Sequence, residues 1–262
     1  MIKQAYLRSI IWLNGKSKSA AVRLTRLTGK SQVPIHPKHL VTIQENLPWY
    51  LDHIKSDMMV LDIGCGQGVH SLRVARQGTK VFGVDYNWRS LETGQVLQQE
   101  EPTLPVTFMV GNVERPLPFP DQTFDLILML DVIEHLYQRT QALREAHRVL
   151  KADGILLLAA PNRNTKWKHR LRAAGLPSET DPDHKVEYIW SELQDELAQG
   201  GFVVKDEPTI IVYDTPWAGL MDLVGGFSLA LYEKLARWKV LKVQGNPQET
   251  SGWRVVCQRI NP

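Results

Sequence analysis

The fold is decided by the stretch Val60-Leu61-Asp62-Ile63-Gly64-Cys65-Gly66-Gln67-Gly68. It completes a short apolar run, residues 58–63, that ends abruptly at Gly64. This is the pattern of a buried strand that runs into a tight turn. Glycines are needed in such a turn where a ligand approaches the backbone closely, because side chains would block it. A second apolar run, residues 80–84, ends at Asp85, whose carboxylate can accept hydrogen bonds from both hydroxyls of a ribose.

Outward from this stretch, short apolar strands alternate with amphipathic helices. The pattern predicts further strands at residues 106–110, 124–130 and 154–160, and helices at residues 37–54, 70–77, 89–99 and 141–150. Such alternation is typical of a mostly parallel sheet with helices on both faces. In the last third we expect a helix at 191–199, a strand pair or one long strand at 202–213, and a final strand at 253–260.

Composition places the chain among ordinary globular proteins. It has 262 residues, of which 43% are hydrophobic and 23% charged, which excludes disordered, collagen-like and disulfide-stapled proteins. The two cysteines, Cys65 and Cys257, are too far apart in sequence to indicate a metal site or a disulfide framework. A reducing, cytoplasmic compartment is the natural expectation.

The charge is unevenly distributed. Residues 1–44 contain eight Lys and Arg and no Asp or Glu, so the rest of the chain is net negative. Such a segment suits a surface or partner-binding helix, a targeting peptide or a solvated extension. We predict a basic helical extension at residues 1–36, followed by one domain at 37–262 with a lid insertion at about 214–250.

The predicted lid and a second basic segment suggest contacts with other molecules. Residues 215–242 are rich in Trp, Leu, Val and Gly, but Asp222 and the Gly225-Gly226 pair weaken a membrane span. We expect an amphipathic lid or a membrane-surface helix pair there, with ordinary core or dimer packing as the alternative. Residues 163–172 carry six basic side chains around Trp167, and they could bind phosphates or be solvated.

The glycine spacing separates two classes of enzyme. The turn reads G-x-G-x-G after Asp62, whereas nicotinamide-binding proteins use G-x-G-x-x-G. Together with the later strings GVD, GNVERPLPFPDQTFDLI, DVIEH and REAHRVLKADGILLLAAPN, it resembles the class I S-adenosylmethionine-dependent methyltransferases. The resemblance covers roughly residues 58–202. It implies a Rossmann-like, seven-stranded sheet whose last strand, here residues 253–260, is antiparallel.

The resemblance also implies a cofactor site. The methionine part of S-adenosylmethionine would lie at Asp62, Gly64, Gly66 and Gly68, and the ribose hydroxyls at Asp85. Asn112 stands where the family usually has Asp, and its carbonyl can still accept a hydrogen bond from an adenine amino group. The remaining residues assigned to cofactor binding are Cys65, Tyr86 beside the adenine, Val113, and Leu130 near the sulfur.

The acceptor side is assigned to Glu134, His135 and His184. On a helix start, Asp131, Glu134 and His135 would share one side of the turn. Two methyltransferase groups that this chain resembles here, the ubiquinone-pathway O-methyltransferases and the small-RNA terminal-ribose methyltransferases, hold a divalent metal with a similar pattern. A metal site at Asp131, Glu134, His135 and His184 is therefore one hypothesis, although Asp131 is shorter than the usual Glu. A second hypothesis is a base or substrate contact without a metal, and a third is a purely structural role.

We therefore expect methyl transfer from S-adenosylmethionine, by in-line displacement, to an oxygen of a small or lipid- or sugar-linked acceptor. A metal-assisted RNA or ribose O-methyltransferase is one alternative. A nicotinamide-dependent oxidoreductase is another, and a non-catalytic protein that binds a membrane surface or nucleic acid is a third. Peripheral membrane contact would use the basic N-terminus and residues 215–242.

Overall fold

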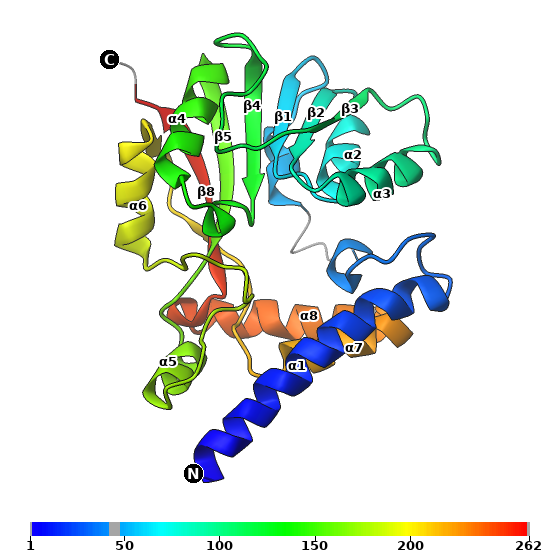
Figure 1. Cartoon of the computed structure of the whole chain (residues 1–262), viewed down its shortest axis with the longest axis vertical. Helices are drawn as coiled ribbons and strands as arrows, with labels where there is room; N and C mark the ends of the chain where they lie inside the picture. Colours follow the sequence, from blue (N-terminus) through cyan, green and yellow to red (C-terminus); the bar gives the residue numbers. More distant parts are fainter. Residues whose placement is uncertain (1, 42–47, 261–262) are drawn as a thin grey trace. The chain divides into compact units, whose positions relative to one another are not determined.

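The computed structural model describes residues 2–41 and 48–260. The described chain divides into two compact units (Figure 1). The sheet unit comprises residues 50–162, 181–209 and 252–260. The helical unit comprises the described part of residues 1–49 together with residues 163–180 and 210–251. Each unit is therefore assembled from three separate segments of the chain.

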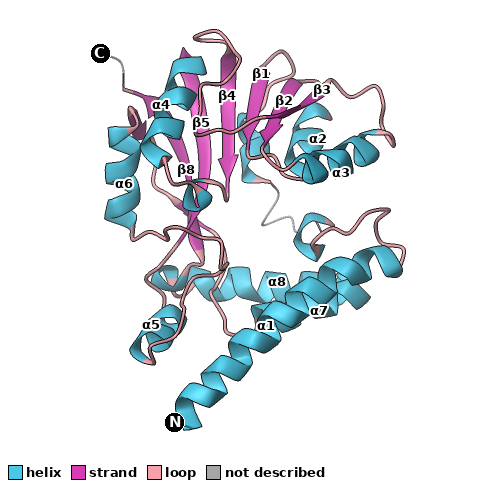
Figure 2. Ribbon diagram, viewed as in Figure 1, coloured by secondary structure: helices cyan, strands magenta, loops and turns pink. Residues whose placement is uncertain are grey.

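A mostly parallel sheet forms the centre of the sheet unit (Figure 2). Within the described residues, seven strands lie in the order β3-β2-β1-β4-β5-β8-β6, and the two-residue strand β7 also pairs with β8. Strand β8 is antiparallel to both β5 and β6, whereas the other neighbours are parallel. This confirms the predicted fold class. The strand bounds are β1 Met59–Ile63, β2 Lys80–Asp85, β3 Val106–Val110, β4 Phe124–Leu130, β5 Leu150–Pro161, β6 Phe202–Val204, β7 Thr209–Ile210 and β8 Gly252–Arg259.

The central strands contain long apolar runs because both faces of the sheet are covered. Four consecutive residues of β4, Leu126 to Met129, are fully buried. Helices α2 and α3 pack against β2 and β3, and helices α4 and α6 pack against β5 and β6 (Figure 1). The helix bounds are α2 Val69–Ala75, α3 Trp88–Gln98, α4 Arg139–Val149 and α6 Trp190–Gln199, with short 3-10 helices η3 at Trp49–His53 and η4 at Ile133–His135.

The predicted helix at residues 37–54 is wrong. The structure has two 3-10 turns there, η1 at Pro37–His39 and η3, and residues 42–47 of the prediction lie outside the described residues. Pro48 is incompatible with one continuous helix, because proline lacks the amide hydrogen that the helical hydrogen bond requires.

In the helical unit, a long N-terminal helix packs along the first of the two predicted lid helices. The bounds are α1 Ile2–Leu27, α5 Lys166–Ala173, α7 Ala218–Phe227 and α8 Leu229–Gln244, with the 3-10 turn η5 at Pro247–Glu249. Helix α1 approaches α7 closely, because Gly219 and Gly226 present no side chain to it. The amide of Gly219 donates to Asn14 Oδ1 at 3.0 Å, and Thr28 Oγ1 donates to the carbonyl of Gly226 at 3.1 Å.

The division into units differs from the predicted layout. The extension at 1–36 and the lid at 214–250, predicted as separate additions, belong to one unit that also includes residues 163–180. The helix pair predicted for residues 215–242 is observed as α7 and α8. Within the described residues, no helix combines the length and the apolarity needed to cross a membrane.

Candidate active site

The glycine turn after β1 has the conformation that its sequence predicts. Gly64, Gly66 and Gly68 have φ angles of +67°, +52° and +70°, a region that other residues enter only with strain. A Cβ atom at Gly64 would lie 2.5 Å from Val132 Cγ2, and one at Gly68 would lie 2.3 Å from Phe108 Cζ. At Gly66, in contrast, a Cβ would meet no atom within 4 Å. Two of the glycines thus allow close packing, and the third leaves its side open.

Asp85 ends strand β2 and is tied to this turn. Its Oδ2 accepts a hydrogen bond from the Gly66 amide at 2.8 Å, and its Oδ1 accepts one from the Asn87 amide at 2.8 Å. The carboxylate is therefore fixed in position and almost fully buried, with 8% of Asp85 exposed. Each carboxylate oxygen has two lone pairs, so both oxygens can still accept a hydrogen bond from a ligand hydroxyl.

Two further residues of the turn are buried. Asp62 Oδ2 accepts a hydrogen bond from Ser71 Oγ at 2.6 Å, and burial raises the pKa of Asp62 to about 7. Cys65 packs its sulfur against strand β2, where a Cβ on Gly83 would lie 2.9 Å from Sγ. Burial raises the pKa of the Cys65 thiol, so this thiol is an inert packing group.

The other residues predicted to bind the cofactor lie at or after the ends of strands β2, β3 and β4. Tyr86 is 78% exposed, whereas Val113 is buried. Asn112 is exposed, and its Oδ1 accepts a hydrogen bond from the Glu114 amide at 2.9 Å. Leu130 is half-buried at the end of β4. Because β1 pairs with both β2 and β4 and β2 pairs with β3, all in parallel, these positions share the carboxyl-terminal edge of the sheet.

This edge fits a sulfonium nucleoside. Gly66 leaves open space beside the backbone, Asp85 presents a fixed acceptor pair, and Asp62 adds a carboxyl group within the turn. S-Adenosylmethionine would use these groups for its ribose hydroxyls and its cationic methionine end. No pyrophosphate-binding turn is required, since the cofactor carries no phosphate.

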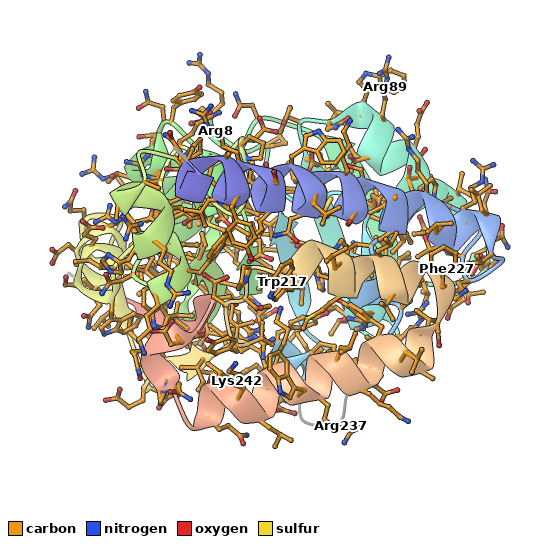
Figure 3. The ribbon with its side chains drawn as sticks, turned by 90° about the horizontal axis from the view of Figure 1, so that it is seen from below. Arg8, Arg89, Trp217, Phe227, Arg237 and Lys242 are labelled. Carbon is orange, nitrogen blue, oxygen red and sulfur yellow. The ribbon has the colours of Figure 1, made fainter. Side chains whose placement is uncertain are left out.

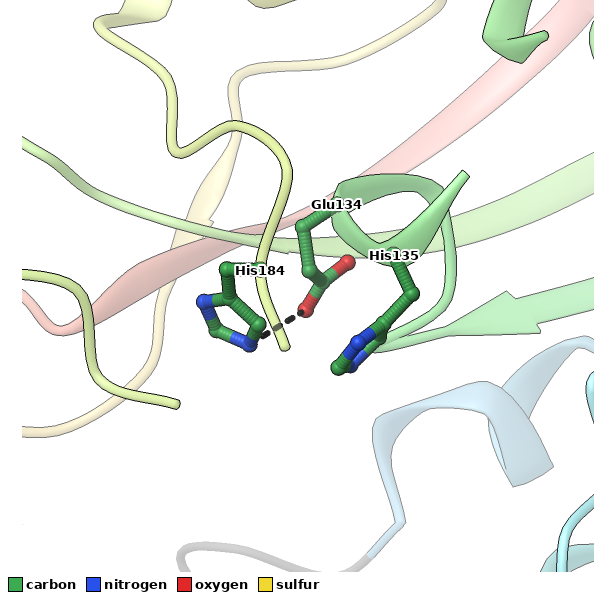
Figure 4. A group of neighbouring side chains, drawn as sticks. All are labelled: Glu134, His135 and His184. Atoms are coloured by element: carbon green, nitrogen blue, oxygen red, sulfur yellow. Dashed lines mark ion pairs between the residues drawn. The ribbon is translucent and has the colours of Figure 1, made fainter. Parts of the chain in front are cut away.

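A second group of side chains follows strand β4. Glu134 and His135 lie in η4, and His184 lies in the loop between α5 and α6 (Figure 4). One potential ligand atom from each of the three residues lies within 4.8 Å of the others. The rings of His135 and His184 meet edge to face with centroids 4.7 Å apart, and His184 Nε2 is 3.9 Å from Glu134 Oε1. The structure therefore brings together the three residues predicted for the acceptor side.

Backbone contacts hold the two segments together. The amides of Lys185 and Val186 both donate to the carbonyl of Glu134, at 2.7 and 3.3 Å. Asn162, at the end of β5, forms a bridge with Tyr188. Because the bonds from Lys185 and Val186 directly follow His184 on the chain, they hold its loop against η4.

Asp131 does not join this group. The sequence predicted that Asp131, Glu134 and His135 would share one side of a helix start, but the chain forms a 3-10 turn there instead. Asp131 has a φ of +57°, which breaks helical geometry before the turn begins. Asp131 is exposed whereas Glu134 is 2% exposed. The four-residue metal set predicted from the sequence is reduced to Glu134, His135 and His184.

The electrostatics of the group favour a neutral imidazole at His135. Burial lowers the pKa of His135, and the neighbouring His184 lowers it further. A histidine with a lowered pKa is neutral at pH 7 and can accept a proton. His135 is half-buried, whereas the side chain of His184 is only 8% exposed.

Sequence reasoning assigned no role to Glu187. Its Oε1 lies 2.9 Å from His184 Nδ1, and the Glu187 side chain is 2% exposed. A buried carboxylate at one ring nitrogen sets the tautomer and orientation of a histidine. The only sequence feature that could have indicated this contact is the spacing of three residues between His184 and Glu187. In a loop, unlike a helix, that spacing does not predict that two side chains are in contact.

Comparison with known proteins shows what the sheet unit is similar to. Residues 61–158 match the family model described as a methyltransferase domain. A probable S-adenosylmethionine-dependent methyltransferase from Mycolicibacterium smegmatis is 31% identical over 147 residues, which cover 56% of this chain and 52% of that protein. A ubiquinone biosynthesis O-methyltransferase from Proteus mirabilis is 30% identical over 154 residues, which cover 58% of this chain and 60% of that protein. The chain thus spans about half the length of the curated relatives that it matches.

Solved structures share the fold. Magnesium protoporphyrin IX methyltransferase from Synechocystis PCC 6803, solved with bound SAH, has a TM-score of 0.57 at 17% identity, covering 85% of this chain and 84% of its own. A [4+2]-cyclase has a TM-score of 0.58 at 20% identity, covering 79% and 77%. Because a cyclase has this fold, the fold alone does not define the reaction. The family match over residues 61–158, the motif order and the sheet topology show that the sheet unit is similar to the class I S-adenosylmethionine-dependent methyltransferase domains.

Proposed function

We propose that the protein transfers a methyl group from S-adenosylmethionine to an oxygen of a small-molecule acceptor, with His135 as the general base. The observation that supports this most strongly is the position of η4. Val132, the residue before η4, lies against Gly64 of the glycine turn. The pair Glu134-His135 therefore follows directly from a residue that packs on the proposed cofactor turn.

Each group has a distinct task in this proposal. When bound, S-adenosylmethionine supplies a methyl group on a sulfonium sulfur, and an acceptor oxygen can displace that sulfur from the methyl carbon in line. His135, neutral at pH 7, accepts the proton of the acceptor hydroxyl as its O–H bond breaks, an assistance worth about 10²- to 10⁴-fold. The Asp181 and Asp183 carboxylates favour the protonated form of His135 once it has the proton, whereas His184, oriented by Glu187, opposes it. Alignment of acceptor and methyl supplies much of the remaining acceleration.

The finer identity of the acceptor is also a proposal. We favour a hydroxyl carried by a small molecule or by a lipid- or sugar-linked group, because a base is needed only when the nucleophile must lose a proton. The relative named as a ubiquinone biosynthesis O-methyltransferase acts, by its name, on oxygen. It is similar to this chain over little more than half of either protein.

A bound divalent metal is the second candidate, favoured by the donor set itself. Two imidazoles and one carboxylate whose ligand atoms lie within 4.8 Å of one another suit zinc, iron or another first-row metal. Glu134, His135 and His184 would hold the ion, which would then lower the pKa of an acceptor hydroxyl. Under this alternative, removal of metal with EDTA abolishes turnover, and one equivalent of metal is retained on gel filtration.

Two single variants test the proposed division of roles. Asp85→Ala removes both acceptors for the ribose and should weaken S-adenosylhomocysteine binding about 100-fold, corresponding to about 3 kcal/mol. His135→Ala should leave that affinity nearly unchanged and lower turnover about 10²- to 10⁴-fold. Affinity is measured by calorimetry, and turnover as S-adenosylhomocysteine release with acceptors from a panel of phenols and polyols. Equal losses of affinity in both variants would contradict the proposal.

A further inference from the structure

The two units carry opposite charge. The segments of the helical unit contain 17 Lys and Arg but only 6 Asp and Glu, a net charge of +11. The remaining segments contain 14 basic and 22 acidic residues, a net charge of −8. Several acids of the helical unit are also engaged internally: Asp222 pairs with His36 at 3.2 Å, and the buried Glu249 accepts a hydrogen bond from the Lys166 amide at 3.0 Å. The exposed surface of this unit is therefore strongly positive.

Helix α1 presents one apolar side and one basic side. Its buried side, at helical spacing, includes Leu7, Ile10 and Ala21, and α7 packs along it. Some of the exposed residues recur at spacings of three, four or seven and lie on the opposite side. They include Arg8, Trp12, Lys16, Arg23 and Arg26.

Helix α8 exposes large apolar side chains where a solvated helix would carry polar ones. Leu231, Trp238 and Leu241 are 53%, 42% and 61% exposed, and their spacing places them on one side together with the exposed Lys234. Lys242 Nζ lies 4.7 Å from the Trp238 ring centroid and 4.1 Å from that of Tyr213. Such contacts keep a cation beside the aromatic rings.

Helix α7 lies between these two helices, packing against each of them (Figure 3). Trp217 directly precedes it and Phe227 ends it, and these side chains are 41% and 64% exposed. Arg237 and Lys242 project from α8 in the same view (Figure 3). The layer of α1, α7 and α8 thus combines exposed Trp, Phe and Leu with many cations, a pattern that marks an interaction surface.

We propose that this three-helix layer docks on the surface of an anionic lipid bilayer. Lys and Arg are attracted to anionic headgroups, while Trp, Phe and Leu insert at the boundary with the acyl chains. The exposed Leu231 and Leu241 favour a bilayer over nucleic acid, because aliphatic side chains gain little from phosphates or stacked bases. Docking of this kind needs no spanning helix and depends on no step of the proposed methyl transfer.

The test is co-sedimentation of the full chain with phosphatidylcholine vesicles, with and without about one third phosphatidylserine. We expect binding to the anionic vesicles, and little binding to the neutral ones. Each basic residue near the surface contributes about fivefold to partitioning, so the triple variant Arg8→Ala, Lys16→Ala, Arg23→Ala should bind about 100-fold more weakly. That variant should also lose part of the salt dependence between about 0.05 and 0.3 M salt.

A second variant separates insertion from attraction. Trp217→Ser, Phe227→Ser, Trp238→Ser should weaken binding at every salt concentration and leave the salt dependence unchanged. The matched control is Trp88→Ser, Arg89→Ala in the sheet unit, where Trp88 is 52% exposed and Arg89 lies over its ring. This control should bind vesicles as the wild type does. Circular dichroism melting curves establish that each variant is folded.

Three outcomes would overturn the proposal. One is the absence of binding to anionic vesicles, or equal binding to neutral ones. Another is an equal loss of binding in the Trp88, Arg89 control. The third is that the protein does not bind vesicles and instead binds transfer RNA, or self-associates in sedimentation velocity in a way that Trp238→Ser abolishes.

Discussion

The sheet unit and the helical unit both depend on glycines, but for different purposes. In the sheet unit, Gly66 has a positive φ and leaves open space beside the backbone, so its lack of a side chain leaves room for the proposed ligand. In the helical unit, Gly219 and Gly226 lie within α7, and the space that a side chain would need is filled by α1. The same residue type therefore leaves room for a proposed ligand at Gly66 and for a neighbouring helix at Gly219 and Gly226.

The charge of the two units shows a parallel difference. The acids of the proposed active site, Asp62, Asp85 and Glu134, are individually buried and held by specific contacts. The cations of the helical unit, such as Arg8 and Lys16, are exposed on one side of a helix. The first arrangement selects one ligand by geometry, whereas the second attracts any extended anionic surface.

The largest expected effect comes from alanine at the packed glycines. Gly68→Ala forces a Cβ to within 2.3 Å of Phe108 Cζ at a φ of +70°, and should lower the free energy of unfolding by about 2–5 kcal/mol. Gly219→Ala meets the Asn14 carbonyl at 2.3 Å and should cost about 1–3 kcal/mol. Urea denaturation measures both. Only Gly68→Ala should also lose S-adenosylhomocysteine binding, and a loss in Gly219→Ala as well would break the distinction between the units.

Gly66→Ala should affect the ligand more than the fold. The left-handed backbone costs alanine about 1–2 kcal/mol, but no atom lies within 4 Å of the new Cβ. The methyl group would instead occupy the space proposed for the cofactor, so the calorimetric affinity should fall at least about tenfold. Unchanged affinity would place the ligand elsewhere.

These glycines also show which parts of the molecule a sequence can predict. The turn at 60–68 and Asp85 could be predicted because a contiguous motif and the ends of two apolar runs define them. The helical unit could not, since it joins segments as far apart as Asn14 and Gly219, 205 residues along the chain. The spacing of Asp131 and Glu134 wrongly predicted that they share one side of a helix, because the amino-acid sequence does not reveal the positive φ at Asp131.

The pH dependence of turnover tests the role of His135. Burial and His184 lower its pKa. As pH rises, the imidazole therefore loses its proton at a pH below the ordinary histidine pKa of about 6.5. Turnover should therefore be constant above that value and fall about tenfold per pH unit below it. A pH profile of kcat/KM at saturating cofactor measures this. A fall in kcat/KM toward low pH that is centred well above pH 6.5 would contradict the assignment. The same fall, unchanged in His135→Ala, would also contradict it.

The smallest effect concerns Asp62. Its pKa of about 7 means that near neutral pH a large fraction of the carboxyl groups is protonated in the free protein. A cationic methionine end favours the carboxylate, so cofactor binding should release a proton, and affinity should rise by up to about tenfold as pH increases from 6 to 8. Asp62→Asn should flatten this dependence. Calorimetry in buffers of different ionisation enthalpy counts the proton, and no release by the wild type would contradict the prediction.

The most direct test of the cofactor site is an NMR titration of the ¹⁵N-labelled protein with S-adenosylhomocysteine. The amides of Gly66 and Asn87 both donate to the Asp85 carboxylate, so they report on any hydroxyl that shares it. Our account predicts saturable shifts at residues 64–68 and at Asn87, with the amides of α1 unchanged. Saturable binding that leaves Gly66 and Asn87 unshifted, or that shifts α1 instead, would contradict it.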